Sequence, residues 1–190
     1  MTAVRARSLA LDLVPVLAFA ALTAIASQLS VHAWPVPFTL QTTAVLASGL
    51  MLGARRGALS QATYLAMGAA GMPVFAELKF GPQWLFGPTG GYLMAYPFAA
   101  FLVGYLAERG MDRRYLTSVI AMIVGLIVVY ACGALWLGLF ARTAAGNASV
   151  GLQSALMSGV APFVAADIAK LLMAAAIVPG LWRIVGRAGR

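Results

Sequence analysis

The chain has 190 residues, of which 62% are apolar and 9% charged, and its formal net charge is +8. Soluble domains carry about a quarter charged residues, so this composition predicts a chain that covers its outer surface with apolar side chains in lipid. The basic residues stand in small clusters between long apolar stretches, which is typical of anchors beside a membrane and argues against a nucleic-acid-binding patch. A single cysteine, Cys132, and a single histidine, His32, argue against a disulfide, a metal cage and a catalytic triad. We therefore expect no metal and no cofactor.

Apolar runs that are separated by charged or Pro/Gly-rich segments predict one all-α transmembrane domain over residues 1–190 with six helices. The first run follows Arg5 and Arg7 like a signal peptide, but its length suits a full span of the bilayer. The second and third runs are short, and we expect a tight hairpin around Arg55 and Arg56, since a single helix would bury both guanidinium groups. The predicted spans are about 9–31, 40–54, 57–70, 90–107, 115–140 and 162–182.

The basic residues assign the two sides of this six-span arrangement. Lys79 and Arg142 fall on one side, and Lys170 lies inside a helix. The positive-inside rule then places both termini in the cytoplasm. Ten basic residues fall on the cytoplasmic side: Arg5, Arg7, Arg55, Arg56, Arg109, Arg113, Arg114, Arg183, Arg187 and Arg190.

The external connections are long and rich in proline. Residues 31–39 contain two prolines, and residues 71–91 contain three prolines and several aromatic side chains. Neither segment suits a regular helix, and aromatic content favours an ordered loop over a disordered one. The Gly/Ser/Ala-rich stretch 141–161 leaves room for a short surface helix. We predict long, ordered external loops.

Asp167 and Lys170 are the ionisable residues within the last apolar segment. Their spacing of three places them on one helical face, shared with Phe163 and Ala174. Pro162 suits the first turn, so the pair is expected in the outer half of the membrane, facing the bundle interior. Intramembrane charges mark a ligand, ion or proton site. A structural pair that locks two helices together is the alternative.

Other signals are less specific. Ala20 and Ala24 form a small-residue stripe on the first helix, which allows close approach either of a partner protein's helix or of this chain's own bundle. Trp34, Trp84 and Trp182 stand near predicted helix ends, where tryptophan commonly anchors at the membrane interface. Trp84, which lies in the long loop, is the best candidate for a ligand contact.

Four segments resemble one known family. They are PVPFTLQT (35–42), MLGARRGALSQATYLAMGAAGMPVF (51–75), FGPTGGYLMAYPFAA (86–100) and PFVAADIAK (162–170). Together they resemble the BioY type, the biotin-specific substrate-binding subunit of energy-coupling-factor (ECF) vitamin transporters. The resemblance implies a six-helix protein of the bacterial inner membrane that captures biotin from outside. It also implies a transmembrane coupling protein, docked on the alanine stripe, and cytoplasmic ATPase subunits as partners. Family members that occur without these partner subunits are known. The resemblance also leaves open whether the chain forms a homo-oligomer.

The resemblance assigns the ligand site around the charged pair. The Asp167 carboxylate can accept hydrogen bonds from the ureido N–H groups of biotin, and Lys170 can donate to the ureido carbonyl or pair with the biotin carboxylate. These two roles of Lys170 stay open. Further candidates are Tyr92, Thr89 and Gln41 as polar contacts and Phe75, Trp84 and Phe86 as covers of the biotin ring.

One segment departs from the family pattern. This chain has Glu77-Leu78-Lys79-Phe80 where relatives often carry small or amide residues. Glu77 either accepts an N–H bond from the ligand or forms a solvated loop pair with Lys79. Alternatives to biotin capture are capture of another small vitamin, an intramembrane enzyme that uses Asp167 as acid or base, and a structural scaffold.

Overall fold

The computed structural model describes residues 2–31, 36–139 and 151–188, with side chains for residues 13–30, 36–139 and 151–176. His32, Trp34 and Arg142 and the side chain of Trp182 lie outside these ranges. The described chain is almost entirely helical. Its α-helices are α1 (Thr2–Gln28), α2 (Gln41–Leu52), α3 (Ala54–Ala69), α4 (Gly90–Leu106), α5 (Tyr115–Leu139), α6 (Leu152–Gly159) and α7 (Ala161–Ala188).

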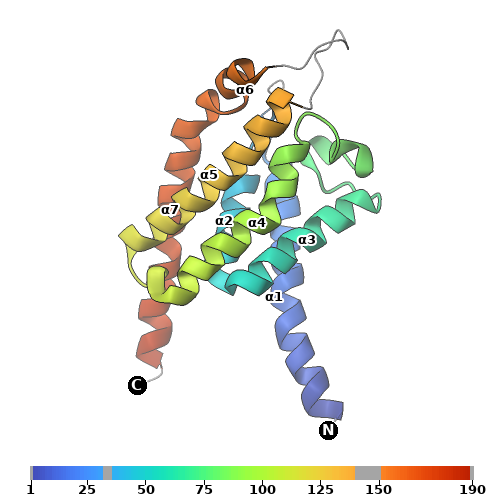
Figure 1. Ribbon diagram of the computed structural model, residues 1–190. Coiled ribbons are helices and arrows are strands. Elements are labelled where there is room, and N and C mark those ends of the chain that lie inside the picture. The colour runs from blue at the N-terminus through green and yellow to red at the C-terminus, as the bar shows by residue number, and fades with distance from the viewer. Residues whose placement is uncertain (1, 32–35, 140–150, 189–190) are drawn as a thin grey trace.

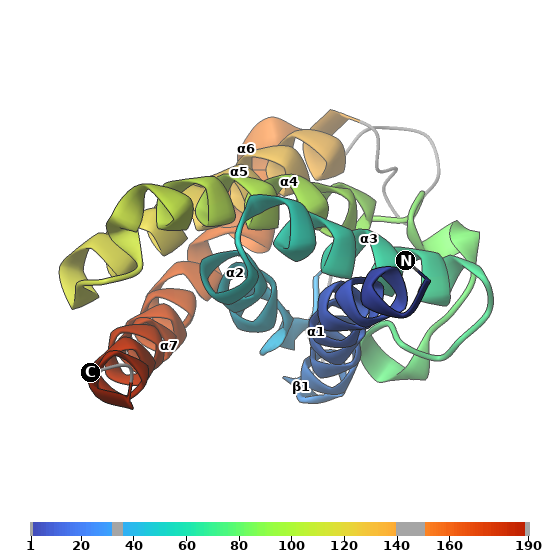
Figure 2. The same cartoon turned by 90° about the horizontal axis from the view of Figure 1, so that it is seen from below.

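The helices form one bundle whose two ends differ (Figure 1). The beginning of α1 and the end of α7 lie at one end, together with the α2–α3 and α4–α5 connections. The long loops and α6 lie at the opposite end, called here the loop end. Seen along the bundle, α4 and α5 form one row and α1, α2 and α7 another (Figure 2). Helix α3 packs against α1, α2 and α4.

Short elements order the loop end. Strand β1 (Ser30–Val31) pairs antiparallel with β2 (Phe38–Thr39) and draws the α1–α2 connection together. Two 3₁₀ turns, η1 (Ala76–Leu78) and η2 (Pro82–Trp84), order the proline-rich segment between α3 and α4. A short helix, for which segment 141–161 leaves room, is present as α6. It meets α7 at a bend of 43°.

The break between α2 and α3 lies earlier than expected. The sequence predicts a hairpin around Arg55 and Arg56, but α2 ends at Leu52 and both arginines belong to the first turn of α3. Gly53 makes the turn, with a φ of 82° that side chains rarely adopt. The Glu108 carboxylate accepts a hydrogen bond from the Ala54 N–H at 2.8 Å. An acidic oxygen thus satisfies a free donor at the start of α3.

Small residues set the spacing of the helices. A β-carbon at Gly49 would collide with the backbone of Ala100, and one at Gly104 would collide with the backbone of Ala54. In lipid, no hydrophobic effect drives helices together, and close packing at small residues stabilises their association instead. Ala20 also belongs here, because it is fully buried in the core and Ala24 packs against that core. Ala20 therefore faces this chain's own bundle, which is one of the two alternatives that the sequence leaves open for the stripe.

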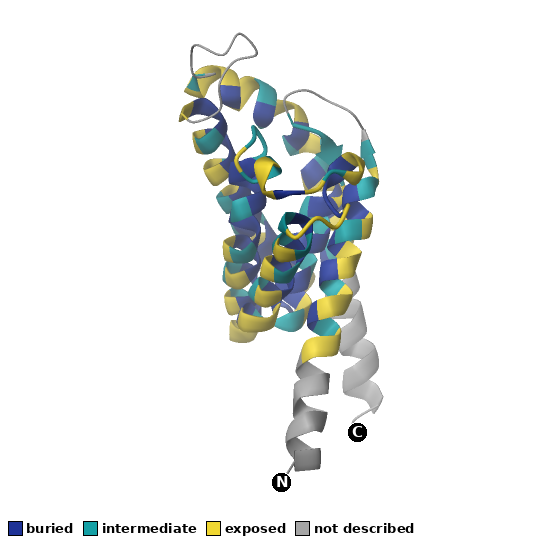
Figure 3. Ribbon diagram, turned by 90° about the vertical axis from the view of Figure 1, so that its right-hand side faces the viewer, coloured by how far each residue is buried: buried dark blue, intermediate teal, exposed yellow. Residues whose placement is uncertain are grey.

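The buried residues lie between the helices, and exposed residues lie on their outward faces (Figure 3). In the described part, two helices are long and apolar enough to cross a membrane, Gly90–Met111 and Tyr115–Leu139. The bent pair of α6 and Ala161–Ala176 makes a third if it counts as one span. Exposed apolar side chains along the bundle include Val14, Ile25, Phe98, Leu116, Ile127 and Met173.

Candidate functional site

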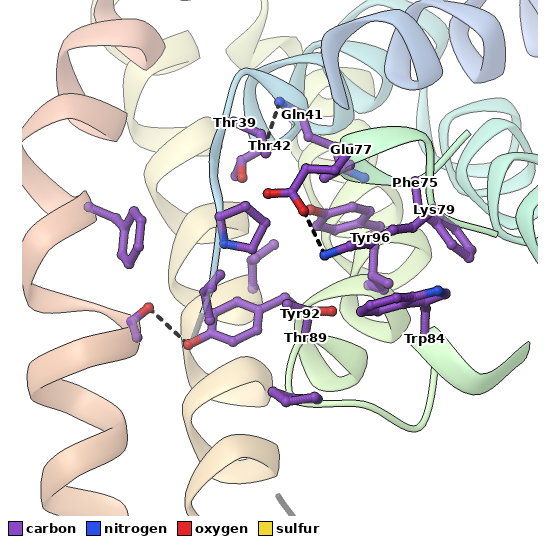
Figure 4. Close-up of a pocket in the computed structure, with 18 of the residues that line it drawn as sticks. Thr39, Gln41, Thr42, Phe75, Glu77, Lys79, Trp84, Thr89, Tyr92 and Tyr96 are labelled. Carbon is purple, nitrogen blue, oxygen red and sulfur yellow. Dashed lines mark hydrogen bonds and ion pairs between the residues drawn. The ribbon is translucent and has the colours of Figure 1, made fainter. Parts of the chain in front are cut away.

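A cavity of about 270 Å³ lies at the loop end of the bundle. Helices α2, α4, α5 and α7 form its walls, and the α1–α2 and α3–α4 connections contribute further lining residues. Figure 4 shows side chains from these elements converging on it. The polar and charged lining residues are Thr39, Gln41, Thr42, Glu77, Lys79, Thr89, Tyr92, Tyr96, Tyr130 and Asp167, and the other residues include Phe75, Trp84 and Phe163.

Asp167 places a carboxylate in the wall of this cavity. Its residue is 8% exposed, and each of its oxygens has a donor. The Tyr130 hydroxyl donates to Oδ2 at 2.7 Å, and the Lys170 ammonium donates to Oδ1 at 2.5 Å. The second-turn position on α7 predicted from Pro162 is present, since α7 begins at Ala161. Two fixed donors hold the carboxylate in one orientation, and its remaining lone pairs can accept bonds from a ligand.

Lys170 stands behind Asp167 rather than in the cavity wall. Its ammonium also donates to the Thr39 carbonyl at 2.8 Å and lies 3.8 Å from the centre of the Phe38 ring. It is absent from the residues that line the cavity. Both roles expected for Lys170, toward the ureido carbonyl or the biotin carboxylate, need direct contact. In this structure the Lys170 ammonium instead pairs with the Asp167 carboxylate.

Gln41 lines the cavity at the start of α2 and is 4% exposed. Its Nε2 donates to the Tyr64 hydroxyl at 2.5 Å, and that hydroxyl donates to the Val74 carbonyl at 3.1 Å. The chain of bonds connects α2 through α3 to the loop that follows α3. Gln41 therefore combines a place in the cavity wall with a fixed side-chain orientation.

Glu77 and Lys79 line the cavity from the α3–α4 loop. Their side chains form an ion pair of 2.8 Å, drawn as a dashed line in Figure 4, and are 27% and 31% exposed. The Lys79 ammonium also lies 4.3 Å from the centre of the Trp84 ring. The two residues thus form a loop pair, as one interpretation of the sequence expected, but this pair faces the cavity.

The remaining predicted residues separate into two groups. Tyr92, Thr89, Phe75 and Trp84 line the cavity. The Tyr92 hydroxyl donates to the Gly159 carbonyl at 2.9 Å, which ties α4 to the end of α6. Phe86 is different: it is 73% exposed and does not line the cavity. The prediction that Phe86 covers the ligand ring is therefore not met in this structure, because its side chain lies largely exposed on the surface.

Sequence reasoning missed Tyr130, Tyr96 and Thr42, which also line the cavity. Tyr130 lies in the middle of the most apolar helix, where a tyrosine resembles a packing residue. The available signal was its distance from both helix ends, because interface-anchoring tyrosines stand near the membrane surface. A buried hydroxyl in mid-helix needs a partner, and here that partner is Asp167.

Comparisons with known proteins agree on one family. The model of the BioY family matches residues 1–187. The chain belongs to the BioY family. Similar proteins include the probable biotin transporter BioY of Pyrococcus horikoshii, 42% identical over 86% of this chain and 91% of that protein. The biotin transporter BioY of Thermotoga maritima is 41% identical over 84% of this chain and 88% of its own.

A solved structure shows the same fold as this BioY-family chain. It is the S-component for biotin from an ECF-type ABC transporter, which matches with a TM-score of 0.80, 26% identity and 93% coverage of both chains. The all-helical architecture is therefore that of an ECF S-component. The named relatives in the BioY family are transporters rather than enzymes, so the intramembrane-enzyme alternative loses its support.

Proposed function

We propose that this chain is the substrate-binding subunit of an ECF-type transporter and captures biotin in the cavity at its loop end. The observation that carries the proposal is the Asp167 carboxylate, buried in the wall of an enclosed space and held by two donors. Relatives named as biotin transporters and the fold of a biotin S-component support biotin as the ligand. A buried, oriented acceptor suits a ligand that presents N–H donors.

The ureido ring of biotin is the part that fits Asp167. It carries two N–H groups, and a carboxylate accepts from such donors in charge-assisted bonds that are stronger than neutral ones. Lys170 offsets the negative charge, so a neutral ureido group can approach without an unpaired buried charge. The Tyr130 hydroxyl, already bound to the same carboxylate, lies beside this subsite.

The valeryl carboxylate of biotin suits a positively charged partner. Among the described residues that line the cavity, Lys79 is the one cation. We assign the ligand carboxylate to it, with Glu77 as the competing anion that Lys79 holds when no ligand is bound. Trp84 and Tyr92 supply aromatic surface for the apolar bicyclic ring. This assignment gives the ligand one orientation, with the ureido ring toward α7 and the carboxylate toward the α3–α4 loop.

For the membrane arrangement, we propose six crossings by α1 to α5 and α7, with both termini in the cytoplasm of a bacterial cell. Support comes from the exposed arginines at the end of the bundle where α1 begins and α7 ends. They are Arg55, Arg56, Arg109, Arg113 and Arg114. The cavity then opens toward the outside, where the vitamin is captured. Any step driven by ATP belongs to a coupling protein and ATPase subunits, the partners that an S-component implies.

The test is equilibrium binding of labelled biotin to the detergent-purified protein, with other small vitamins as competitors. We expect a nanomolar dissociation constant, equivalent to about −12 kcal/mol, and displacement by biotin but not by the other vitamins. Absence of binding at micromolar biotin would contradict the proposal. Displacement by a different vitamin at lower concentration would assign the cavity to that vitamin.

A further inference from the structure

A strained turn contributes to the wall of the cavity. The Phe75 N–H donates to the Lys79 carbonyl at 3.0 Å, and the two residues pair as an isolated antiparallel bridge. Between them, Glu77 has a φ of 61° and Leu78 a φ of 58°. Turns with two such residues favour asparagine and glycine, because a β-carbon disfavours the left-handed region. Glutamate and leucine persist in this conformation only where the surroundings hold them.

Gln28, the last residue of α1, provides that hold. Its Oε1 accepts a hydrogen bond from the Leu78 N–H at 3.0 Å, and its Nε2 donates to the Phe75 carbonyl at 3.0 Å. One amide thus bridges two backbone groups of the turn. Its neighbour Ser27 is fully buried and donates to the Val74 carbonyl at 2.7 Å. The end of α1 is therefore tied to three backbone groups of the loop that follows α3, at Val74, Phe75 and Leu78.

The turn matters for the cavity because its side chains are cavity walls. Phe75, Glu77 and Lys79 all line the enclosed space, whereas Gln28 does not. The Lys79 ammonium lies over Trp84, so the turn also orders the next part of the loop. Movement of the turn would therefore widen the cavity on this side. The bonds from Gln28 oppose that movement.

We propose that Gln28 is a positioning residue that latches the Phe75–Lys79 turn over the cavity, so that the end of α1 controls the rate of ligand release. The proposal rests on the proposed biotin binding for its kinetic consequence, but the latch itself is a property of the ligand-free protein. Gln28 acts on the ligand only through the turn. Its removal therefore speeds dissociation more than it slows association.

The first arm of the test needs no ligand. Gln28→Met keeps the length and apolar stem of the side chain but removes both bonds. We expect hydrogen exchange in the peptide that contains Leu78 to rise about tenfold, the change that two lost hydrogen bonds of ordinary strength predict. Exchange within α4 and α5 should stay unchanged. Unaltered exchange at Leu78 would overturn the latch, even if the protein binds no biotin and the proposed function fails.

The second arm measures release of bound labelled biotin after dilution into unlabelled biotin. Gln28→Met should raise the dissociation rate about tenfold and change the association rate less than about twofold. The matched control is Gln83→Met, because Gln83 lies in the same loop but its amide donates to the Phe80 carbonyl of that loop rather than bridging the turn from α1. Equal dissociation rates in wild type and Gln28→Met, or an equal rise in Gln83→Met, would overturn the proposal.

Gln28→Glu keeps the test decisive if the methionine variant fails to fold. A carboxylate retains an acceptor for the Leu78 N–H but loses the donor to the Phe75 carbonyl. We expect a rise of about threefold in the dissociation rate, as the loss of one hydrogen bond predicts. A rate equal to that of the wild type would contradict the latch.

Discussion

Two buried polar clusters lie in this bundle, and they differ in what they face. The Asp167 cluster consists of Asp167, Lys170, Tyr130 and the Thr39 carbonyl, and both its carboxylate and its tyrosine line the cavity. The Gln61 cluster joins α1, α2 and α3, and none of its side chains lines the cavity. Its members are Gln61, Thr23, Ser48 and Ser60, all fully buried.

The hydrogen bonds of the Gln61 cluster connect its members to one another and to carbonyls of their own helices. Nε2 of Gln61 lies 3.2 Å from the Thr23 hydroxyl, 3.0 Å from Ser48 and 3.1 Å from Ser60. Each of these hydroxyls donates in turn to a carbonyl of its own helix. The Gln61 Oε1 has no protein partner among the described residues. Such a cluster fastens neighbouring helices and offers little to a ligand.

The difference shows that polar burial in a membrane bundle does not by itself mark a binding site. A charged acceptor that reaches an enclosed space can bind a ligand, while an amide among back-bonded hydroxyls holds helices together. The comparison predicts that substitutions in the Asp167 cluster change affinity and that substitutions in the Gln61 cluster change stability.

Asp167→Asn should have the largest effect. It replaces the charge-assisted bonds to the ureido N–H groups by neutral ones, and we expect biotin affinity to fall by about 3 kcal/mol, a factor of about 150. Titration of the purified variant with labelled biotin measures this. An affinity within threefold of the wild type would show that Asp167 has the same structural role as Gln61.

Lys170→Met comes next, with an expected loss of about 2 kcal/mol in biotin affinity, because the buried Asp167 carboxylate loses its counter-ion. Since Lys170 acts through Asp167, the double variant with Asp167→Asn should lose less than the sum of the two single losses. Binding titrations of the four proteins form the cycle. Strictly additive losses would indicate that Lys170 contacts the ligand independently.

Tyr130→Phe removes a single hydroxyl from the same carboxylate. We expect a loss of about 1.5 kcal/mol in biotin affinity, the usual contribution of a hydrogen bond to a charged group. Tyr105→Phe is a suitable control, because Tyr105 is an exposed tyrosine of α4 that does not line the cavity. An equal change in both variants, measured by the same titration, would remove Tyr130 from the site.

Gln61→Met should have the smallest effect on binding. The amide leaves behind three hydroxyls that keep their own backbone bonds, so we expect affinity to stay within about twofold and stability to fall by about 1 kcal/mol. Thermal unfolding with and without biotin separates the two quantities. A loss of affinity comparable to that of Tyr130→Phe would break the distinction between the clusters.

The sequence was sufficient to predict most of the helices and the burial of the Asp167–Lys170 pair. Charged residues inside an apolar segment must face the bundle, so the spacing of Asp167 and Lys170 was enough to predict their burial on one helical face. Segments rich in proline and glycine placed most helix ends to within a few residues, but α1 begins at Thr2 rather than near residue 9, and α7 ends at Ala188 rather than near residue 182. At the α2–α3 break, the positive φ of Gly53 decides the turn rather than the charges of Arg55 and Arg56.

Other features depend on tertiary contacts that no local pattern contains. Whether Phe86 or Trp84 enters the cavity depends on the path of the loop, which is irregular and has no period that fixes a face. Whether the alanine stripe faces inward depends on the rotation of α1, and Ala20 proved to be buried. The hydrogen bond from the Leu78 N–H to Gln28 joins residues that are 50 positions apart in the sequence.

The most direct test of the central claim is a structure of the protein with biotin bound. The account predicts biotin in the cavity at the loop end, with a ureido nitrogen about 2.7–3.2 Å from a carboxylate oxygen of Asp167. Biotin in the reverse orientation, with its carboxylate beside Asp167, or biotin bound elsewhere on the bundle, would contradict it.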